Sequence, residues 1–127
     1  MQLSKNFSKS EFECRCMCEM PKEVLNNVQK VANQLQALRN VVGKPINVNS
    51  AYRCVYHNSK IGGTKNSQHI LGKASDIVID GMTPDDVAHL IEQMIDNGDM
   101  LQGGLGRYNT FTHYDIRKTK ARWNFKN

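Results

Sequence analysis

Three side chains, His69, Asp76 and His113, are of types that together could hold a catalytic metal ion. Two imidazoles and a carboxylate supply three protein ligands and leave a fourth position free, which is typical of a catalytic rather than a structural zinc site. The simpler alternative is that His69 caps a loop, Asp76 satisfies a turn and His113 lies half-buried in a sheet. Because the chain has 4 His and 12 Asp and Glu residues, a triplet could arise by chance, and spacing alone leaves both interpretations equally open.

Asp115 and His57 are the candidates for proton transfer beside such a metal. His113 and Asp115 are two residues apart on a predicted strand, so their side chains leave the same face while that of Tyr114 leaves the other. Asp115 is the first candidate, either as a general base or as a carboxylate that orients a metal ligand. His57 is the second candidate, and its alternative is a loop histidine that hydrogen-bonds its own backbone.

Four cysteines form a separate motif. Cys14, Cys16 and Cys18 alternate along the chain, and Cys54 directly follows Arg53. Four thiols could hold a second, structural zinc ion, although Cys-x-Cys-x-Cys is not the usual paired Cys-x-x-Cys motif. Disulfides are the rival interpretation, and a chain made in the cytoplasm argues mildly against them. Free, reduced thiols are the third, and the sequence leaves all three open.

Length and charge limit what kind of protein this is. The 127 residues suffice for one domain with a hydrophobic core, so we expect a single domain over residues 1–127 with a Cys-rich loop at residues 13–20. The formal charge of +5 favours an anionic partner, such as nucleic acid, an anionic cell wall or an acidic membrane. The first residues lack the apolar stretch of a secretory signal, and no segment approaches the length of a membrane span. We therefore expect a monomer that is made in the cytoplasm and does not insert stably into membranes.

Apolar spacing predicts two main helices. Apolar residues recur at three- and four-residue intervals over residues 21–42, and a glycine and a proline then end the pattern. A second helix is predicted for residues 83–98, where a capping threonine and a proline in the first helical position precede a buried stripe. Ser8 and Glu11 have the spacing of a capping box, which predicts a single helical turn at residues 8–12.

Alternating and apolar runs predict the strands. They fall at residues 46–50, 74–80, 107–108 and 111–117, with a flexible glycine-rich approach at residues 103–106 and a turn at residues 109–110. Gly72 allows the chain to fold back between His69 and the strand that carries Asp76. The sum is an α+β fold in which two main helices pack on a small, mostly antiparallel sheet.

Basic and aromatic residues gather near the C-terminus. They are Lys118, Lys120, Arg122, Lys126, Trp123 and Phe125. Such a cluster could stack nucleic-acid bases, but it could equally be a solvated tail or a patch that meets an anionic wall polymer.

A longer series of motifs resembles that of a known family. The chain contains, in order, Asn49-Ser50-Ala51-Tyr52-Arg53, His57-Asn58, Gly62-Gly63, Ser67-Gln68-His69, Gly72, Ala74, Asp76-Ile77 and Phe111-Thr112-His113-Tyr114-Asp115. This order is similar to that of the zinc-dependent D-Ala-D-Ala carboxypeptidase-like peptidases, the peptidase M15 family, in its small bacterial and phage branch. Several motifs in a fixed order are far more specific than any one of them.

The resemblance implies a hedgehog-like, D-Ala-D-Ala peptidase-like fold and a catalytic Zn²⁺ held by His69, Asp76 and His113. It implies an endolysin-like zinc peptidase that hydrolyses peptidoglycan stem or cross-link peptides, either as a carboxypeptidase or as an endopeptidase. Arg53 matches the arginine of the family's Ser-Gly-Tyr-Arg stretch. Its permanently charged, forked guanidinium could grip a substrate carboxylate or steady an oxyanion.

One departure from the family pattern concerns the general base. Better-known members place an acidic residue two or three positions before the last histidine ligand, where this chain has Phe111 and Thr110. The alternative function is therefore a non-catalytic, metal-containing cell-wall-binding or phage structural module. As a peptidase without a signal peptide, the protein is expected to reach the wall through a phage-encoded pore. Its expected partner is a peptidoglycan peptide and not nucleic acid.

Overall fold

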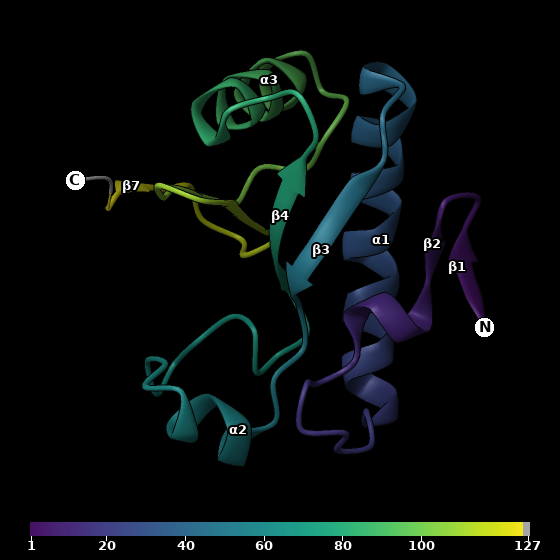
Figure 1. The fold of residues 1–127 in the computed structure, drawn as a ribbon, viewed down its shortest axis with the longest axis vertical. Helices are drawn as coiled ribbons and strands as arrows, with labels where there is room; N and C mark the ends of the chain where they lie inside the picture. Colours follow the sequence, from purple (N-terminus) through teal and green to yellow (C-terminus); the bar gives the residue numbers. More distant parts are fainter. Residues whose placement is uncertain (126–127) are drawn as a thin grey trace.

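A five-stranded sheet forms the centre of the protein in the computed structural model, which describes residues 1–125 (Figure 1). In spatial order its strands are β3 (Ile46–Ser50), β4 (Ala74–Ile79), β6 (Thr112–Asp115), β5 (Gly104–Arg107) and β7 (Ala121–Asn124). Neighbouring strands pair antiparallel except β5 and β7, which pair in parallel. The α+β class and the mostly antiparallel sheet predicted from the sequence are confirmed.

The two predicted helices are present as α1 (Lys22–Val42) and α3 (Pro84–Asp96). Gly43 ends α1 with a φ of 67°, the left-handed conformation that glycine adopts at little cost. The side chain of Thr83 accepts a hydrogen bond from the backbone of Asp86 and caps α3. The buried stripes of both helices join one face of the sheet in a single core, where Leu105 and Tyr114 are fully buried. The opposite face of the sheet is left for polar residues.

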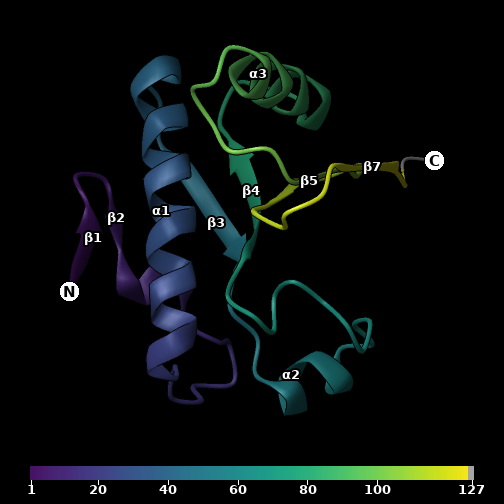
Figure 2. The same cartoon turned by 180° about the vertical axis from the view of Figure 1, so that it is seen from behind.

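Several short elements were not predicted. A hairpin of β1 (Gln2–Ser4) and β2 (Phe7–Ser8) lies on the side of α1 away from the sheet, as Figures 1 and 2 both show. One short element was predicted: the helical turn expected at residues 8–12 is present as the 3₁₀ helix η1 (Lys9–Phe12), with its capping box formed. A short helix, α2 (Val55–Lys60), follows β3. The hairpin and α2 are too short to show a sequence period, and they depend on tertiary contacts, so apolar spacing does not predict them.

The prediction of a flexible approach at residues 103–106 is wrong. Residues 104–106 belong to β5, which lies inside the sheet between β6 and β7. A Cβ atom on Gly104 would collide with the carboxylate of Asp115, and one on Gly106 would collide with the indole of Trp123. The glycines therefore make room for neighbouring side chains on the polar face, and they do not signal flexibility.

The C-terminal segment is also more ordered than a solvated tail. Residues 121–124 form β7, and Arg122 makes two hydrogen bonds to the carboxylate of Glu92 on α3, at 2.7 and 2.8 Å. Lys126 lies outside the described residues. Within residues 1–125, none of the helices combines the length and apolar character needed to cross a bilayer.

Candidate metal centre

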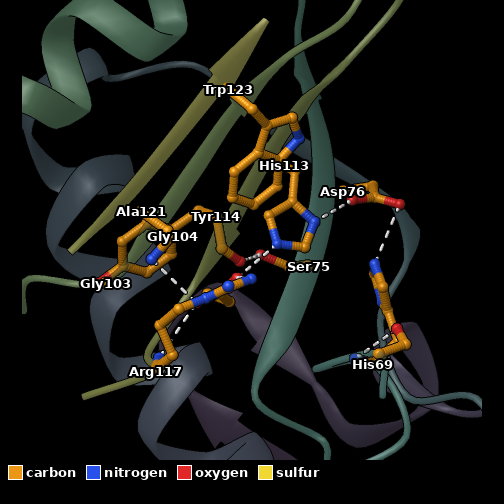
Figure 3. A network of polar contacts seen from close by, with 12 residues as sticks. His69, Ser75, Asp76, Gly103, Gly104, His113, Tyr114, Arg117, Ala121 and Trp123 are labelled. Atoms are coloured by element: carbon orange, nitrogen blue, oxygen red, sulfur yellow. Dashed lines mark hydrogen bonds and ion pairs between the residues drawn. The ribbon is translucent and has the colours of Figure 1, made fainter. Parts of the chain in front are cut away.

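His69, Asp76 and His113 converge on the polar face of the sheet (Figure 3). Asp76 on β4 lies directly opposite His113 on β6 in the strand register. His69 comes from the loop before β4, and the chain turns back to the strand at Gly72, which has a φ of 73°. All three residues are buried, and each offers one ligand atom within 4.8 Å of the others. The structure thus brings His113 together with two groups from a distant part of the sequence.

Hydrogen bonds fix the orientation of both imidazole rings. The carbonyl oxygen of Ala51 lies 2.6 Å from Nδ1 of His69, so Nδ1 carries the proton and Nε2, 3.3 Å from Asp76, is left as an acceptor. In His113, Nε2 lies 2.7 Å from Asp115 and Nδ1 lies 3.0 Å from Asp76. With the Nε2 proton donated to Asp115, Nδ1 of His113 is free to act as a ligand. Each ring therefore presents a lone pair toward the carboxylate of Asp76.

Asp115 is fully buried behind His113. Its carboxylate accepts hydrogen bonds from the backbone N–H of Gly104 at 2.9 Å and from the Arg117 guanidinium at 2.9 and 2.7 Å. Together with Nε2 of His113, these donors engage both carboxylate oxygens. Asp115 is placed to hold an imidazole ring rather than to meet a molecule in the cleft.

The charge state of the centre follows from these contacts. Burial alone would raise the pKa of Asp76, but its contacts with the His113 and His69 rings hold that pKa well below its usual range. The pKa of Asp115 is likewise low, because hydrogen bonds from His113 and Arg117 outweigh the effect of burial. Burial would lower the pKa of His113, whereas the nearby carboxylates of Asp115 and Asp76 raise it. Both carboxylates are therefore ionised near neutral pH, and that of Asp76 favours a cation between it and the two histidines.

Arg53 lies at the edge of the centre. One Nη atom of its guanidinium is 3.4 Å from Asp76, its Nε bonds Ser50 Oγ at 3.2 Å, and the other Nη bonds the side chain of Asn58 at 3.2 Å. Asn58 is buried and also donates to the carbonyl of Thr64 at 2.8 Å. Asn58 therefore connects Arg53 to the loop at residues 62–64, a role that its place in the sequence motif did not indicate.

The three candidate ligands line a cavity of about 560 Å³. Arg53 and Arg117 contribute positive charge to its wall, and the loop at residues 61–68 forms another part of the lining. Four aromatic side chains also line it, and they are Tyr108, Phe111, Trp123 and Phe125. A cavity of this size, with apolar walls and a few convergent polar groups, suits a small peptide or its end.

Trp123, Phe125 and Arg117 were not predicted at the metal centre from the sequence, although the two aromatic residues were named in the C-terminal cluster. The Trp123 ring lies 5.0 Å from the His113 ring and 5.2 Å from the guanidinium of Arg117, measured from the ring centroid. It reaches there because Gly106, opposite both His113 and Trp123 in the register, has no side chain. The available signals were the alternation of glycines at 104 and 106 and the lone tryptophan of the chain. Neither signal indicates a site unless it is known that β7 pairs in parallel with β5, which places Trp123 beside Gly106.

His57 is placed away from the metal centre. It lies on α2, and a ring nitrogen is within 4.8 Å of the sulfur atoms of Cys14 and Cys16. His57 is not among the residues that line the cavity, and neither is Asp115. Of the carboxylates in the described chain, Asp76 is the one that faces the cavity.

The donor set fits zinc. Two neutral imidazole nitrogens and a carboxylate oxygen are common zinc ligands, and three of them leave room for water or substrate. The hydrogen bonds from His69 to Ala51 and from His113 to Asp115 are of the kind that orient metal-binding histidines. The centre therefore has the ligand types, burial and supporting contacts of a metal-dependent hydrolase.

Comparison with known proteins agrees with this class. A family model described as Peptidase M15 matches residues 5–115, and the chain belongs to the peptidase M15 family. The zinc D-Ala-D-Ala carboxypeptidase of Streptomyces albus G is 49% identical over 45 residues, which are 35% of this chain and 18% of that protein. The matched part is thus a small fraction of that relative's length. The resemblance inferred from the sequence motifs is confirmed at the level of the family.

Proposed function

We propose that this protein is a zinc-dependent peptidase that hydrolyses peptidoglycan stem or cross-link peptides. The observation that carries the proposal is the convergence of His69, Asp76 and His113 at a solvent-accessible cavity in a peptidase M15 chain. The match to a zinc D-Ala-D-Ala carboxypeptidase supports both the metal and the substrate class.

His69, Asp76 and His113 would hold the zinc ion through the atoms that already face one another. When bound, zinc supplies a water molecule acidified to a pKa of roughly 7 and polarises the carbonyl of the scissile bond. Asp76 contributes the negative charge of the ligand set. Ala51 and Asp115 hold the two imidazole rings in the orientation that binding requires.

The two arginines of the cavity are suited to an anionic substrate group. Arg53 is half-buried and already shares its guanidinium with Asp76, Ser50 and Asn58, so its position is fixed before substrate arrives. We assign it to a substrate carboxylate or to the oxyanion that develops during hydrolysis. Arg117 is engaged by Asp115 and stacks near Trp123, and it adds positive charge on the opposite side of His113.

Asp115 has the contacts of a positioning residue. An Asp115→Asn protein should bind zinc about 10–100-fold more weakly, because His113 loses the carboxylate that orients it. Its turnover at saturating zinc should fall while the shape of the pH–rate profile persists. If Asp115 were instead the general base, the acidic limb of that profile would disappear. Unchanged turnover and unchanged zinc affinity would contradict both roles.

A test of the function combines metal analysis with digestion of purified peptidoglycan and identification of the products by mass spectrometry. Release of terminal D-alanine indicates a carboxypeptidase, whereas loss of cross-links indicates an endopeptidase. His113→Ala should abolish release, and His89→Ala, which removes an exposed histidine on α3, should not. A His113→Ala protein that still cleaves peptidoglycan would contradict the proposal.

The second candidate is a metal-containing wall-binding module without turnover. It is favoured by one observation: among the described residues, Asp76 is the one carboxylate at the cavity, and it is assigned to the metal. A wild-type protein that holds zinc and binds purified wall in a salt-sensitive way, but releases no peptide, would establish this alternative. Equal binding to nucleic acid would instead favour a general affinity for polyanions.

A further inference from the structure

The four cysteines gather into one cluster, although Cys54 is far from the others in the sequence. Cys14, Cys16 and Cys18 lie in the loop between η1 and α1, and Cys54 lies between β3 and α2. The sulfur of Cys54 is 3.8 Å from that of Cys14, 3.2 Å from that of Cys16 and 3.1 Å from that of Cys18. The sulfur of Cys16 is also 3.1 Å from Cys14 and 2.8 Å from Cys18.

We infer that these four thiolates form a second metal site, of structural type, that takes Zn²⁺ or a similarly soft divalent cation. In a tetrahedral zinc site with Zn–S bonds of about 2.3 Å, neighbouring sulfur atoms are about 3.8 Å apart. The sulfur–sulfur separations of 2.8 to 3.8 Å show the four atoms gathered at or inside that spacing. Disulfides would join sulfur atoms in pairs, whereas Cys16 and Cys54 each lie beside three others.

The backbone around the sulfur atoms supports a thiolate site. The backbone N–H of Cys54 points at the sulfur of Cys14 at 3.4 Å, and that of His57 points at the sulfur of Cys54 at 3.4 Å. A neutral thiol is a weak acceptor, so donors aimed at sulfur are better matched to thiolates. Such donors around ligand atoms are the usual outer contacts of a metal site.

The conformation of the loop also indicates a structural purpose. Met17, between Cys16 and Cys18, has a φ of 70°, and among the described residues it alone adopts positive φ without being glycine. The residue is 90% exposed, so packing of its side chain does not explain the conformation. The turn that it makes, with a hydrogen bond from its N–H to the carbonyl of Cys14 at 3.0 Å, brings the alternating cysteines to one point. Without this turn an alternating run would lie extended and spread its thiols along one side.

The cluster joins two parts of the chain next to the catalytic centre. The guanidinium of Arg15 donates to the carbonyls of Val48 and Asn49, both at 2.9 Å, and Tyr52 N–H donates to the carbonyl of Phe12 at 3.1 Å. These contacts hold the Cys-rich loop against the end of β3. A metal at the cluster would fix Cys54 and therefore the backbone of its neighbour Arg53. The inference goes beyond the peptidase proposal and does not depend on it.

The experiment measures metal stoichiometry in protein purified under reducing conditions and loaded with zinc. Native mass spectrometry and elemental analysis should find two zinc ions in the wild type and one in His113→Ala. The double variant Cys16→Ser, Cys18→Ser should also hold one ion. The control His89→Ala should keep both.

Loading with Co²⁺ identifies the ligands independently of activity. His113→Ala should show thiolate-to-cobalt charge-transfer bands and the strong d–d bands of tetrahedral Co²⁺, and the double cysteine variant should lack the charge-transfer bands. Because loss of a structural metal also impairs folding, the His113→Ala spectrum, taken on a protein with all four cysteines, is the deciding measurement. Its failure to bind any ion, a cobalt spectrum without thiolate bands, or disulfides found by alkylation and mass spectrometry in the zinc-loaded protein would overturn the inference. Thiolate bands in His113→Ala, found together with a zinc-loaded wild type that cleaves no peptidoglycan, would uphold the cysteine site and contradict the peptidase proposal alone.

Discussion

At the scale of single residues, the metal centre depends on groups that do not touch the metal position. Ala51 and Asp115 determine which nitrogen of each histidine is free. Asn58 holds the guanidinium of Arg53 in place. Its side-chain oxygen accepts a hydrogen bond from that guanidinium, and its side-chain amide donates one to the carbonyl of Thr64. These supporting groups are buried, so replacing one leaves an unpaired polar atom and a displaced functional side chain.

Asn58→Ala should lower kcat/KM for peptidoglycan peptides by about tenfold, the equivalent of one hydrogen bond to a charged group. The reason is that Arg53 loses one of its fixed partners while the metal ligands are unaffected. Steady-state kinetics with parallel zinc analysis measures the effect. Ser59→Ala, at the exposed neighbouring position on α2, is the control. A loss of zinc together with activity would show that Asn58 supports the ligands instead.

At the scale of elements, turns and edge strands bring the site residues together. Gly72 separates His69 from β4, and its backbone lies against α1, where an added Cβ would be 2.7 Å from Cγ1 of Val24 and 2.9 Å from the carbonyl oxygen of Val24. β7 contributes Trp123 to the cavity and is tied to α3 through Arg122 and Glu92.

Gly72→Ala should destabilise the protein more than Gly43→Ala. Both glycines have positive φ, which costs an alanine about 1 kcal/mol, but nothing lies within 4 Å of the Cβ position at Gly43. Collision with Val24 should bring the cost at Gly72 to about 2–4 kcal/mol. Chemical denaturation measures both free energies of unfolding. Zinc affinity should fall for Gly72→Ala alone, because its turn lies between two ligands, and equal losses in the two variants would refute this explanation.

Glu92→Gln should reduce the acid sensitivity of the fold. Hydrogen bonds from Arg122 lower the pKa of Glu92 from its usual 4.5, so the folded state binds a proton less readily than the unfolded chain. The stabilisation is complete above about pH 4.5 and is lost as the pH falls below it. Because the pair is partly exposed, its contribution should be about 1 kcal/mol or less.

Unfolding measured over a pH series should therefore show a steeper acidic loss of stability in the wild type than in Glu92→Gln. Glu19→Gln, an exposed glutamate in the Cys-rich loop, is the matched control and should follow the wild type. Parallel curves for wild type and Glu92→Gln would mean that Arg122 does not stabilise the ionised form in solution.

At the scale of the whole molecule, one face of the sheet supplies stability and the other supplies chemistry. Leu105 and Tyr114 face the core beneath α1 and α3, while the alternate residues of the same strands lie on the polar face, where His113 lines the cavity. The polar face buries two carboxylates and two histidines. Arg117 pairs closely with Asp115, whereas Asp76 has a longer contact with Arg53, so a cation held by Asp76 and the two histidines would further stabilise the buried charge. Metal binding should therefore be coupled to folding.

Removal of metal by a chelator should lower the Tm of the wild type by roughly 10 °C or more. A ligand present at 1,000 times its Kd stabilises the folded state by about 4 kcal/mol, and each kcal/mol shifts the Tm of a domain of this size by several degrees. Calorimetry with and without added zinc measures the shift. His113→Ala should show a smaller shift in Tm, which reflects the cysteine cluster. A wild-type Tm that changes with neither chelator nor zinc would contradict metal coupling at the metal centre and at the cysteine cluster.

The sequence by itself determined the two long helices, most of the antiparallel sheet and the family. Residues 21–42 and 83–98 carry apolar periods and caps that act locally, so their structure follows from neighbours in the chain. The ordered motifs around Arg53, His69 and His113 were enough to identify a peptidase M15 chain. The ligand set and the roles of Arg53, Asp115 and His57 remain predictions.

Only the tertiary structure decided what surrounds those motifs. The pairing of β7 with β5 placed Trp123 beside His113, and folding of the loop against α2 gathered four cysteines from two distant segments. Register across strands likewise showed that Gly104 and Gly106 leave space for Asp115 and Trp123, where composition alone suggested flexibility. The physical reason is that a local pattern records which face a residue takes within its own element. Which other element meets that face depends on long-range packing and hydrogen bonding, which no short stretch of sequence contains.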